Sequence, residues 1–269
     1  MPRTHLHLDT LAVSDRQTGP FDLAGKVVVV TGASQGIGRE LTFLLAEAGG
    51  VLVPTARSKA AADELRAEAA TRGVTLHPVL LDVRRTSSID SAVAEAVERH
   101  GRIDVLVNNA GLGHAHRALD VTESDFDEMM AVNLRGVFFM SQAVAREMIP
   151  RGGGRIIMIS SQGGVVGLPA AAVYCASKGG VNMMTKVLAL EWAEHGINVN
   201  AVAPTFIYTP GTAPLLDEPG LRDQILGKIP LRQLGSPADV AGAVVYLATE
   251  ASRLVTGTVL MVDGGWTAQ

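Results

Sequence analysis

Short apolar runs alternate with longer amphipathic stretches along most of the chain. The first run, residues 26–31, is dominated by valine, which is typical of a central strand in a parallel sheet covered on both faces. Later runs also predict strands, at residues 51–53, 74–81, 103–107, 155–160, 197–202 and 258–262.

The stretches between these runs have the apolar spacing of helices that pack against a sheet. The alternation predicts an α/β protein with a single-domain Rossmann-type, doubly wound fold of about seven parallel strands flanked by helices. Ser236 and Pro237 are suited to be the N-cap and first residue of the last helix. The helices are expected at residues 39–48, 60–72, 87–99, 122–148, 171–194 and 237–248.

A glycine-rich segment, residues 32–38, follows the first strand and leads into a helix. Glycines permit a tight turn and a close approach of backbone to ligand, while the helix N-terminus offers free N–H groups to an anion. Strand, glycine-rich turn and helix in this order indicate a dinucleotide-binding site. The residues expected to contact the cofactor here are Gly32, Ser34, Gln35, Gly36, Ile37 and Gly38.

The end of the second strand bears on the choice between NAD and NADP. An acidic residue there would accept a hydrogen bond from the 2′-hydroxyl of NAD, and this chain has none. Arg57 and Ser58 instead offer a cation and a hydroxyl that suit a 2′-phosphate, so NADP(H) is favoured over NAD(H). The alternative for Arg57 is a solvated loop cation. Pro54 lacks a backbone donor and predicts a strand end or a bulge.

Two further strand ends carry candidate cofactor contacts. Asp82, followed by Val83, is placed to accept a hydrogen bond from an adenine amino group, or else to cap the next helix. The small and amide side chains after the fourth strand suit a chain that passes close to a flat ring. The residues expected there are Asn109, Ala110 and Gly111.

Tyr174 and Lys178 are four residues apart, so on one helix they share a face. A cation beside a phenol favours the phenolate, which makes this a candidate proton-transfer pair. Ser161 and Gln162 follow the fifth strand, where active sites of parallel sheets collect, and Ser160 competes with Ser161 for a catalytic role.

Two other features bear on the site. Asn133 is a polar amide within an apolar helix face, where it either is satisfied in the core or holds a water. The Pro- and Gly-rich stretch at residues 204–230 reads as a mobile, substrate-covering segment with a short helix, and Tyr208 within it is a candidate substrate contact. We therefore expect residues 21–269 to form one dinucleotide-binding and catalytic domain, preceded by a polar arm at residues 1–20.

The composition of the chain limits which classes of partner are expected. The chain has 269 residues, a formal net charge of −4 and a pI near 6.0, with scattered cations that predict no nucleic-acid partner. No apolar run is long enough to span a membrane, and the single cysteine, Cys175, fits a reducing, cytoplasmic compartment. His114 and His116 lack paired ligands nearby, so no metal site is expected.

Together these residues resemble the short-chain dehydrogenase/reductase family over nearly all of residues 21–265. The matching motifs are Thr31-Gly32-x-x-x-Gly36-x-Gly38, Asn108-Asn109-Ala110-Gly111, Asn133, Ser161 thirteen residues before Tyr174, and Tyr174-x-x-x-Lys178.

The resemblance implies a role for each of these residues. Tyr174 would exchange a proton with the substrate oxygen, and Ser161 would hydrogen-bond that oxygen. Lys178 would lower the pKa of the phenol and hold the nicotinamide ribose, while Asn133 would anchor a water. Ile207 and Thr209 match positions that contact the carboxamide in the family, whereas Thr205 stands where the family usually has glycine.

The leading hypothesis is an NAD(P)(H)-dependent oxidoreductase that interconverts a secondary alcohol and a ketone on a small polyol, sugar or related carbonyl compound. The alternative is a 3-oxoacyl-[acyl-carrier-protein] reductase, with Arg135, Arg151 and Arg155 as possible docking cations. A non-catalytic cofactor-binding regulatory protein is a third possibility, which the intact Ser161, Tyr174 and Lys178 disfavour. The two long apolar helices and the family resemblance predict a homotetramer.

Overall fold

The computed structural model describes residues 19–268. The polar arm predicted at residues 1–20 lies outside the described residues except for its last two. The backbone oxygen of Pro20 accepts a hydrogen bond of 3.0 Å from the amide of Ala251, so the described chain begins against the end of helix α9 (Pro237–Ala248).

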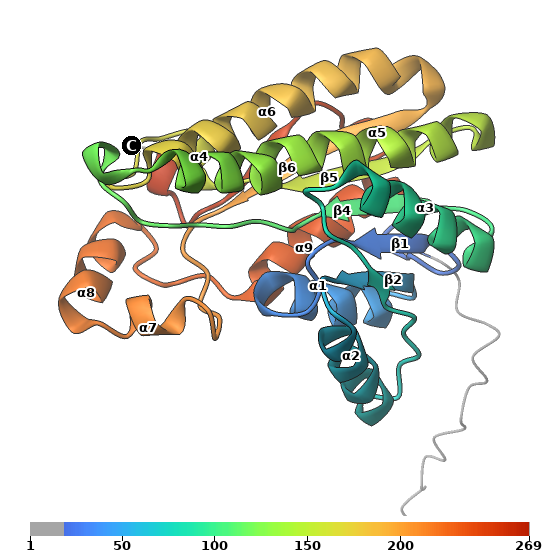
Figure 1. Ribbon diagram of the computed structural model, residues 1–269, viewed down its shortest axis with the longest axis horizontal. Helices are drawn as coiled ribbons and strands as arrows, with labels where there is room; N and C mark the ends of the chain where they lie inside the picture. The colour runs from blue at the N-terminus through green and yellow to red at the C-terminus, as the bar shows by residue number, and fades with distance from the viewer. Residues whose placement is uncertain (1–18, 269) are drawn as a thin grey trace, which may run out of the picture.

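A parallel sheet of seven strands organises the molecule, in the order β3-β2-β1-β4-β5-β6-β7, and Figure 1 shows helices on both of its faces. The predicted doubly wound, Rossmann-type α/β fold is confirmed. The strands are β1 (Val27–Val30), β2 (Val51–Ala56), β3 (Val79–Leu80), β4 (Val105–Asn108), β5 (Gly154–Ile159), β6 (Ile197–Pro204) and β7 (Val259–Val262).

Each face of the sheet has its own apolar core. Helices α1 (Gly36–Glu47), α2 (Lys59–Thr71) and α9 pack on one face. Helices α3 (Thr86–His100), α5 (Val137–Met148) and α6 (Ala172–Trp192) pack on the other. Burial on both faces explains why the strands read as continuous apolar runs instead of alternating ones.

The connection after β6 forms a third, smaller cluster. It contains α7 (Ala213–Leu216) and α8 (Pro219–Lys228), where a single short helix was expected. Leu216, Ile225 and Ile229 are buried together and pack against half-buried neighbours that include Trp266. The α7–α8 unit thus has an apolar centre of its own, apart from the two cores of the sheet.

Pro54 lies within β2 and causes neither a strand end nor a bulge, so that expectation was wrong. The carbonyl of Thr55 accepts from Ala33 on the β1 side, and the carbonyl of Ala56 accepts from Leu81 on the β3 side. Since successive residues of a strand face opposite neighbours, the missing donor of Pro54 faces β3. That strand pairs with β2 only from Thr55 onward, so no ladder bond is lost.

Two other predicted elements differ from the structure. The strand expected at residues 74–81 is limited to the two residues of β3, which pair with Thr55 and Ala56 of β2. The helix expected at residues 122–148 is divided into α4 (Glu123–Met130), a π-helical segment (Ala131–Gly136) and α5. By contrast, the predicted Ser236 N-cap and Pro237 start of α9 are confirmed, including a capping box with Asp239.

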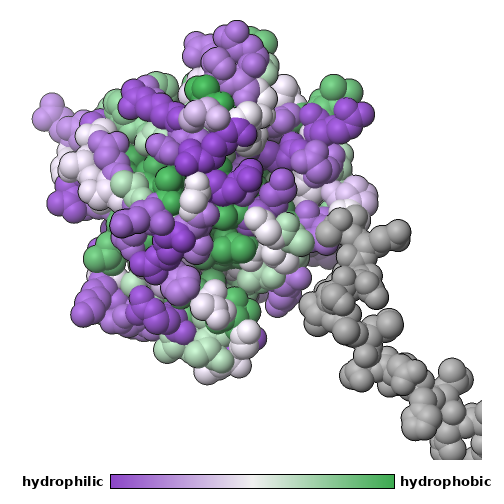
Figure 2. Space-filling view, turned by 90° about the vertical axis from the view of Figure 1, so that its right-hand side faces the viewer, coloured by the Kyte–Doolittle hydropathy of each residue, from purple (hydrophilic) through white to green (hydrophobic). Residues whose placement is uncertain are grey.

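The two ends of the strands have different surfaces. Figure 2 shows the end from which the strands start, where hydrophilic side chains predominate and apolar ones form small patches between them. The candidate catalytic and cofactor-binding residues lie at the other end of the sheet, in the segments that follow the carboxyl ends of the strands.

Candidate active site

Tyr174 lies in the first turn of α6, and its environment favours the neutral phenol. Burial raises the pKa of Tyr174, and a hydrogen bond between its side chain and Ser161 offsets part of that rise. The structure therefore brings together the serine and the tyrosine that the sequence singled out. The expected lowering of the phenol pKa by Lys178 is not found in the protein alone, because burial outweighs any charge effect there.

Lys178 is one turn further along α6 and is only 5% exposed. Its Nζ lies 5.9 Å from the centre of the Tyr174 ring and donates a 2.8 Å hydrogen bond to the carbonyl of Ile159, at the end of β5. Burial lowers the pKa of Lys178 to about 8. The ammonium also reaches the loop after β4, since a Cβ placed on Gly111 would lie 3.6 Å from it.

The two serines after β5 are distinguished by their partners. The hydroxyl of Ser160 donates to Asn182 Oδ1 at 2.6 Å, which ties it into the core. The hydroxyl of Ser161 accepts from the amide of Gly163 at 3.0 Å and keeps its own proton for another acceptor. Ser161 is therefore the serine that can serve the reaction.

Asn133 occupies the π-helical segment and is fully buried. Its Oδ1 accepts from the amide of Leu112, and its Nδ2 donates to the carbonyl of Leu112, both at 2.8 Å. The same Nδ2 donates to Ser177 Oγ at 3.1 Å. Asn133 thus joins the loop after β4 to helix α6, which makes it a positioning residue; its water-holding role stays a prediction.

The glycine-rich turn passes so close to the end of β4 that side chains cannot be accommodated. A Cβ on Gly32 would lie 2.8 Å from Cα of Ala110, and φ of Gly32 is +65°. A Cβ on Gly38 would lie 2.3 Å from both the carbonyl oxygen of Gly32 and Nδ2 of Asn109. Only glycine fits these two positions.

Asn109 and Ala110 hold the turn against β4. The side-chain Nδ2 of Asn109 donates to the carbonyl oxygens of Thr31 and Gly32 at 2.9 and 3.1 Å. The backbone N–H groups of Asn109 and Ala110 both donate to Thr31 Oγ1 at 3.0 Å. Sequence reasoning missed the role of Thr31, although a hydroxyl between a strand and a glycine turn was visible in the motif.

The N-terminus of α1 is open to a ligand. Gln35 is the N-cap residue, and its side chain makes no capping hydrogen bond, so the first-turn N–H groups lack a side-chain acceptor. A Cβ on Gly36 would meet only Thr209, at 4.0 Å. An uncapped helix start beside a glycine cradle fits the pyrophosphate of a dinucleotide, with Ser34 and Ile37 in the same turn and Thr209 facing it.

The end of β2 leaves Arg57 exposed, and it forms no ion pair within the described part of the chain. Ser58 caps α2, since its hydroxyl accepts from the amide of Ala61 at 3.3 Å. The neighbouring Arg39 of α1 is already paired with Glu68. Arg57 is thus an exposed cation at this corner that has no ion pair among the described residues and can meet a phosphate.

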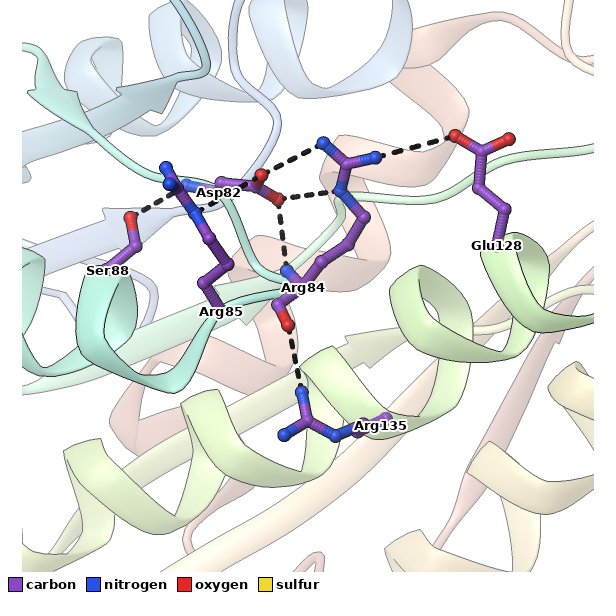
Figure 3. A network of polar contacts seen from close by, with 6 residues as sticks. All are labelled: Asp82, Arg84, Arg85, Ser88, Glu128 and Arg135. Atoms are coloured by element: carbon purple, nitrogen blue, oxygen red, sulfur yellow. Dashed lines mark hydrogen bonds and ion pairs between the residues drawn. The ribbon is translucent and has the colours of Figure 1, made fainter. Parts of the chain in front are cut away.

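Asp82 is engaged by its neighbours, as Figure 3 shows. Its carboxylate accepts from Nε and Nη2 of Arg84, both at 2.9 Å, and lies 3.6 Å from Nε of Arg85. The side-chain hydrogen bond from Arg84 lowers the pKa of Asp82. The N-cap of α3 is Arg85, so the capping alternative for Asp82 was wrong. An adenine contact would have to share this carboxylate with Arg84.

The network around Asp82 also reaches the helices on that face of the sheet. Nη1 of Arg84 lies 3.6 Å from Glu128 on α4, and Arg135 in the π-helical segment donates to the carbonyl of Arg84 at 2.9 Å (Figure 3). Gly136 allows this approach, because a Cβ there would lie 2.8 Å from the carbonyl oxygen of Val83.

The candidate substrate contacts fall into two places. Gln162 is buried between Ser161 and Gly163, and a Cβ on Gly163 would lie 3.4 Å from Cε1 of Tyr174. Tyr208 is instead exposed, and its hydroxyl lies 3.1 Å from both carboxylate oxygens of Asp217. No hydrogen bond joins Tyr208 to Tyr174 among the described residues.

Comparisons with known proteins bear on this geometry. A family model described as enoyl-(acyl carrier protein) reductase matches residues 32–267. A 2-dehydro-3-deoxy-D-gluconate 5-dehydrogenase of Escherichia coli is 41% identical over 93% of this chain and 98% of its own length. The chain belongs to the short-chain dehydrogenase/reductase family. The resemblance inferred from the motifs is thereby confirmed, as is the expected class of oxidoreductase.

Other members of the family match equally widely. A 3-oxoacyl-[acyl-carrier-protein] reductase of Thermotoga maritima is 42% identical over 90% of this chain and 98% of its own length. The crystal structure of a gluconate 5-dehydrogenase from Burkholderia cenocepacia, in complex with NADP and tartrate, has a TM-score of 0.89 and 37% identity, covering 93% of this chain and 98% of that one.

Residues 19–268 contain neither a cluster of metal ligands nor a membrane-spanning helix. No group of three or more His, Cys, Asp or Glu side chains is arranged to hold a metal ion. No helix in that range has both the length and the apolar character required to cross a membrane.

Proposed function

We propose that this chain is an NAD(P)(H)-dependent oxidoreductase that interconverts a secondary alcohol and a ketone on a small polyol, sugar or sugar-acid-like compound. The observation that carries the proposal is the meeting of Ser161, Tyr174 and Lys178 beside a glycine turn in which side chains do not fit. When bound, the nicotinamide cofactor donates or accepts the hydride.

Each residue has a task that follows from its contacts. The Tyr174 phenol gives its proton to the substrate oxygen during ketone reduction and takes one back during alcohol oxidation. The Ser161 hydroxyl donates to the same oxygen and stabilises the charge that develops on it. Lys178, fixed at the carbonyl of Ile159, holds a positive charge near the phenol and the expected position of the nicotinamide ribose.

For the cofactor, we propose that NADP(H) is preferred over NAD(H). The exposed Arg57 at the end of β2, with Ser58 beside it, supplies the charge and hydroxyl that a 2′-phosphate needs. The proposed contacts of the nicotinamide end are Ile207 and Thr209. Val83, Asp82 and the Asn109–Gly111 loop are the proposed contacts of the adenine and the ring face.

A polyol, sugar or sugar acid is favoured over an acyl-carrier-protein substrate by the placement of cations. Arg155 begins β5 at the far end of the sheet and is paired with Glu250, and Arg151 binds Glu147. Arg135 is engaged by the carbonyl of Arg84. The three cations considered for carrier-protein docking are therefore each engaged within the chain. The gluconate dehydrogenases among the relatives support the same substrate class.

We further propose a cytoplasmic homotetramer. The surface of α6 exposes an apolar stripe, Met183, Val187 and Leu190, at helical spacing, and Phe126 is exposed on the adjoining α4. Such a stripe is suited to a subunit interface. We also propose that residues 21–269 form one domain, in which residues 204–230 cover the substrate.

The Tyr174→Phe variant tests the proposed chemistry. Loss of the phenol proton should reduce kcat at least about 1,000-fold. The variant loses both the acid–base group and its hydrogen bond to the substrate oxygen, so we expect an effect in the upper part of the range typical of acid–base catalysis. Cofactor affinity, measured by fluorescence titration with NADPH, should change by less than about threefold because the hydroxyl is not part of the cradle. A variant that keeps the wild-type kcat would refute the assignment.

A further inference from the structure

Two buried polar atoms at the carboxyl edge of the sheet have no hydrogen-bond partner within the described residues. They are Oε1 of Gln162, after β5, and Oγ1 of Thr205, after β6. Gln162 begins a 3-10 turn (Gln162–Gly164) that packs against β6, and Thr205 directly follows β6. The two side chains therefore belong to neighbouring segments at the carboxyl edge of the sheet.

This position adjoins the reacting groups. The side chain of Gln162 is 2% exposed and is flanked in sequence by Ser161, which bonds Tyr174, and by Gly163, which packs against the Tyr174 ring. Thr205 continues directly from β6, where its amide donates to the carbonyl of Val262 at 3.1 Å while its hydroxyl stays unused.

Unpaired polar atoms in a protein interior are unfavourable and call for an explanation. The primary amide of Gln162 has both donors and an acceptor, and the Thr205 hydroxyl can donate and accept. The ligand group that satisfies both is a hydroxyl, since it donates one hydrogen bond and accepts others. A 3-oxoacyl thioester presents only carbonyl oxygens beside its ketone, so it would leave Oε1 of Gln162 without a donor.

We propose that Gln162 and Thr205 together bind a second hydroxyl of the substrate, on the carbon next to the one that Tyr174 serves. The inference rests on the proposed oxidoreductase function and narrows its substrates to vicinal hydroxy compounds. Thr205 is thus a specificity residue that replaces a glycine of the family pattern with a hydroxyl.

Matched alcohols and near-isosteric variants test the pair. Gln162→Met and Thr205→Val remove the hydrogen-bonding groups and keep the volume. We expect kcat/KM for butane-2,3-diol to fall roughly 10- to 100-fold in each variant, and kcat/KM for butan-2-ol to change less than about threefold. Thr258→Val is the control, because the Thr258 hydroxyl makes no hydrogen bond in the described part of the chain, and it should alter neither substrate.

Thermal unfolding of the NADP complex gives a second readout that does not depend on turnover. The diol should raise the unfolding temperature of the wild type, and this rise should be absent in Gln162→Met and Thr205→Val. Equal losses of kcat/KM for both alcohols, or an unchanged preference for the diol, would overturn the proposal. If the wild type oxidises neither alcohol, the diol-induced shift alone decides whether the pair binds a hydroxyl, and the proposed function fails only if polyols and sugars are not turned over either.

Discussion

Burial, more than charge, sets the protonation of the two ionisable groups at the centre of the site. It raises the pKa of the Tyr174 phenol and lowers the pKa of the Lys178 ammonium to about 8, so each group is pushed toward its neutral form. The phenol consequently keeps its proton at neutral pH, which prepares the protein alone to act as an acid toward a ketone.

The Lys178→Met variant should reveal the cost of burying this ammonium. Lys178 changes from a pKa of 10.5 to about 8 on folding, which corresponds to about 3 kcal/mol against the folded state at pH 7. Between pH 8 and 10.5 the unfolded state binds more protons than the native state, so the stability of the wild type rises with pH in this window. The variant lacks this rise.

Urea unfolding at several pH values measures the effect. The free energy of unfolding of Lys178→Met, relative to the wild type, should fall by about 3 kcal/mol from pH 7 to pH 10.5. At pH 7 the variant also loses the hydrogen bond to the Ile159 carbonyl, which offsets part of its gain. A difference that does not change with pH would show that the ammonium is not penalised by burial.

Arg57→Ala tests the preference for a 2′-phosphate. Removing a charge-assisted contact should weaken NADPH binding roughly 10- to 100-fold and leave NADH binding within about twofold. Arg66→Ala, on the exposed surface of the adjacent α2, is the matched control and should affect neither cofactor. Equal binding of both cofactors before and after the change would remove Arg57 from the cofactor site.

At the scale of elements, a single glycine lets the π-helical segment contact the loop after β3 at Val83. In Gly136→Ala the new methyl group would lie 2.8 Å from the Val83 carbonyl, so the helix must shift, and we expect a loss of about 1–3 kcal/mol in unfolding free energy. Gly242→Ala, in α9, meets nothing within 4 Å and should gain up to about 1 kcal/mol.

The stabilities of the two alanine variants are compared by thermal unfolding, with and without NADP. A shifted helix would also displace Asn133, so Gly136→Ala should lose activity where Gly242→Ala does not. Similar stabilities for the two variants would show that the contact with Val83 relaxes freely.

The regular elements were predictable from sequence because their signals are local. Valine runs identify buried strands, and Ser236 with Pro237 marks the exact start of α9. The π-helical segment was not predictable, since its extra residue per turn leaves the apolar spacing of residues 122–148 almost unchanged. Nor was the shortness of β3, which depends on how few of its residues pair with β2.

The candidate site was predictable where its residues follow one another at a fixed spacing, as in the glycine turn and the Tyr174–Lys178 pair. Contacts that depend on the folded backbone were not. The two hydrogen bonds from Arg84 to the Asp82 carboxylate depend on the turn of the backbone after β3. The packing of the Gln162–Gly164 turn against β6 joins segments far apart in the sequence, which no short motif records.

At the scale of the molecule, the proposed assembly can be tested on α6. Leu190 is 81% exposed within the stripe that also contains Met183 and Val187. Leu190→Arg places a charge in the proposed interface and should shift the solution mass, measured by light scattering, from tetramer to smaller species. Leu254→Arg, at an equally exposed leucine outside α6, should leave the mass unchanged. A wild-type monomer would contradict the proposal.

The separate apolar cluster of Leu216, Ile225 and Ile229 means that the α7–α8 unit is joined to the sheet without sharing its cores. Its sequence can therefore drift, or be exchanged in the laboratory, while the hydride and proton chemistry stays intact on the sheet. If residues 204–230 cover the substrate, as proposed, sequence libraries at residues 213–228 should alter substrate preference and leave the buried cores of the sheet unchanged.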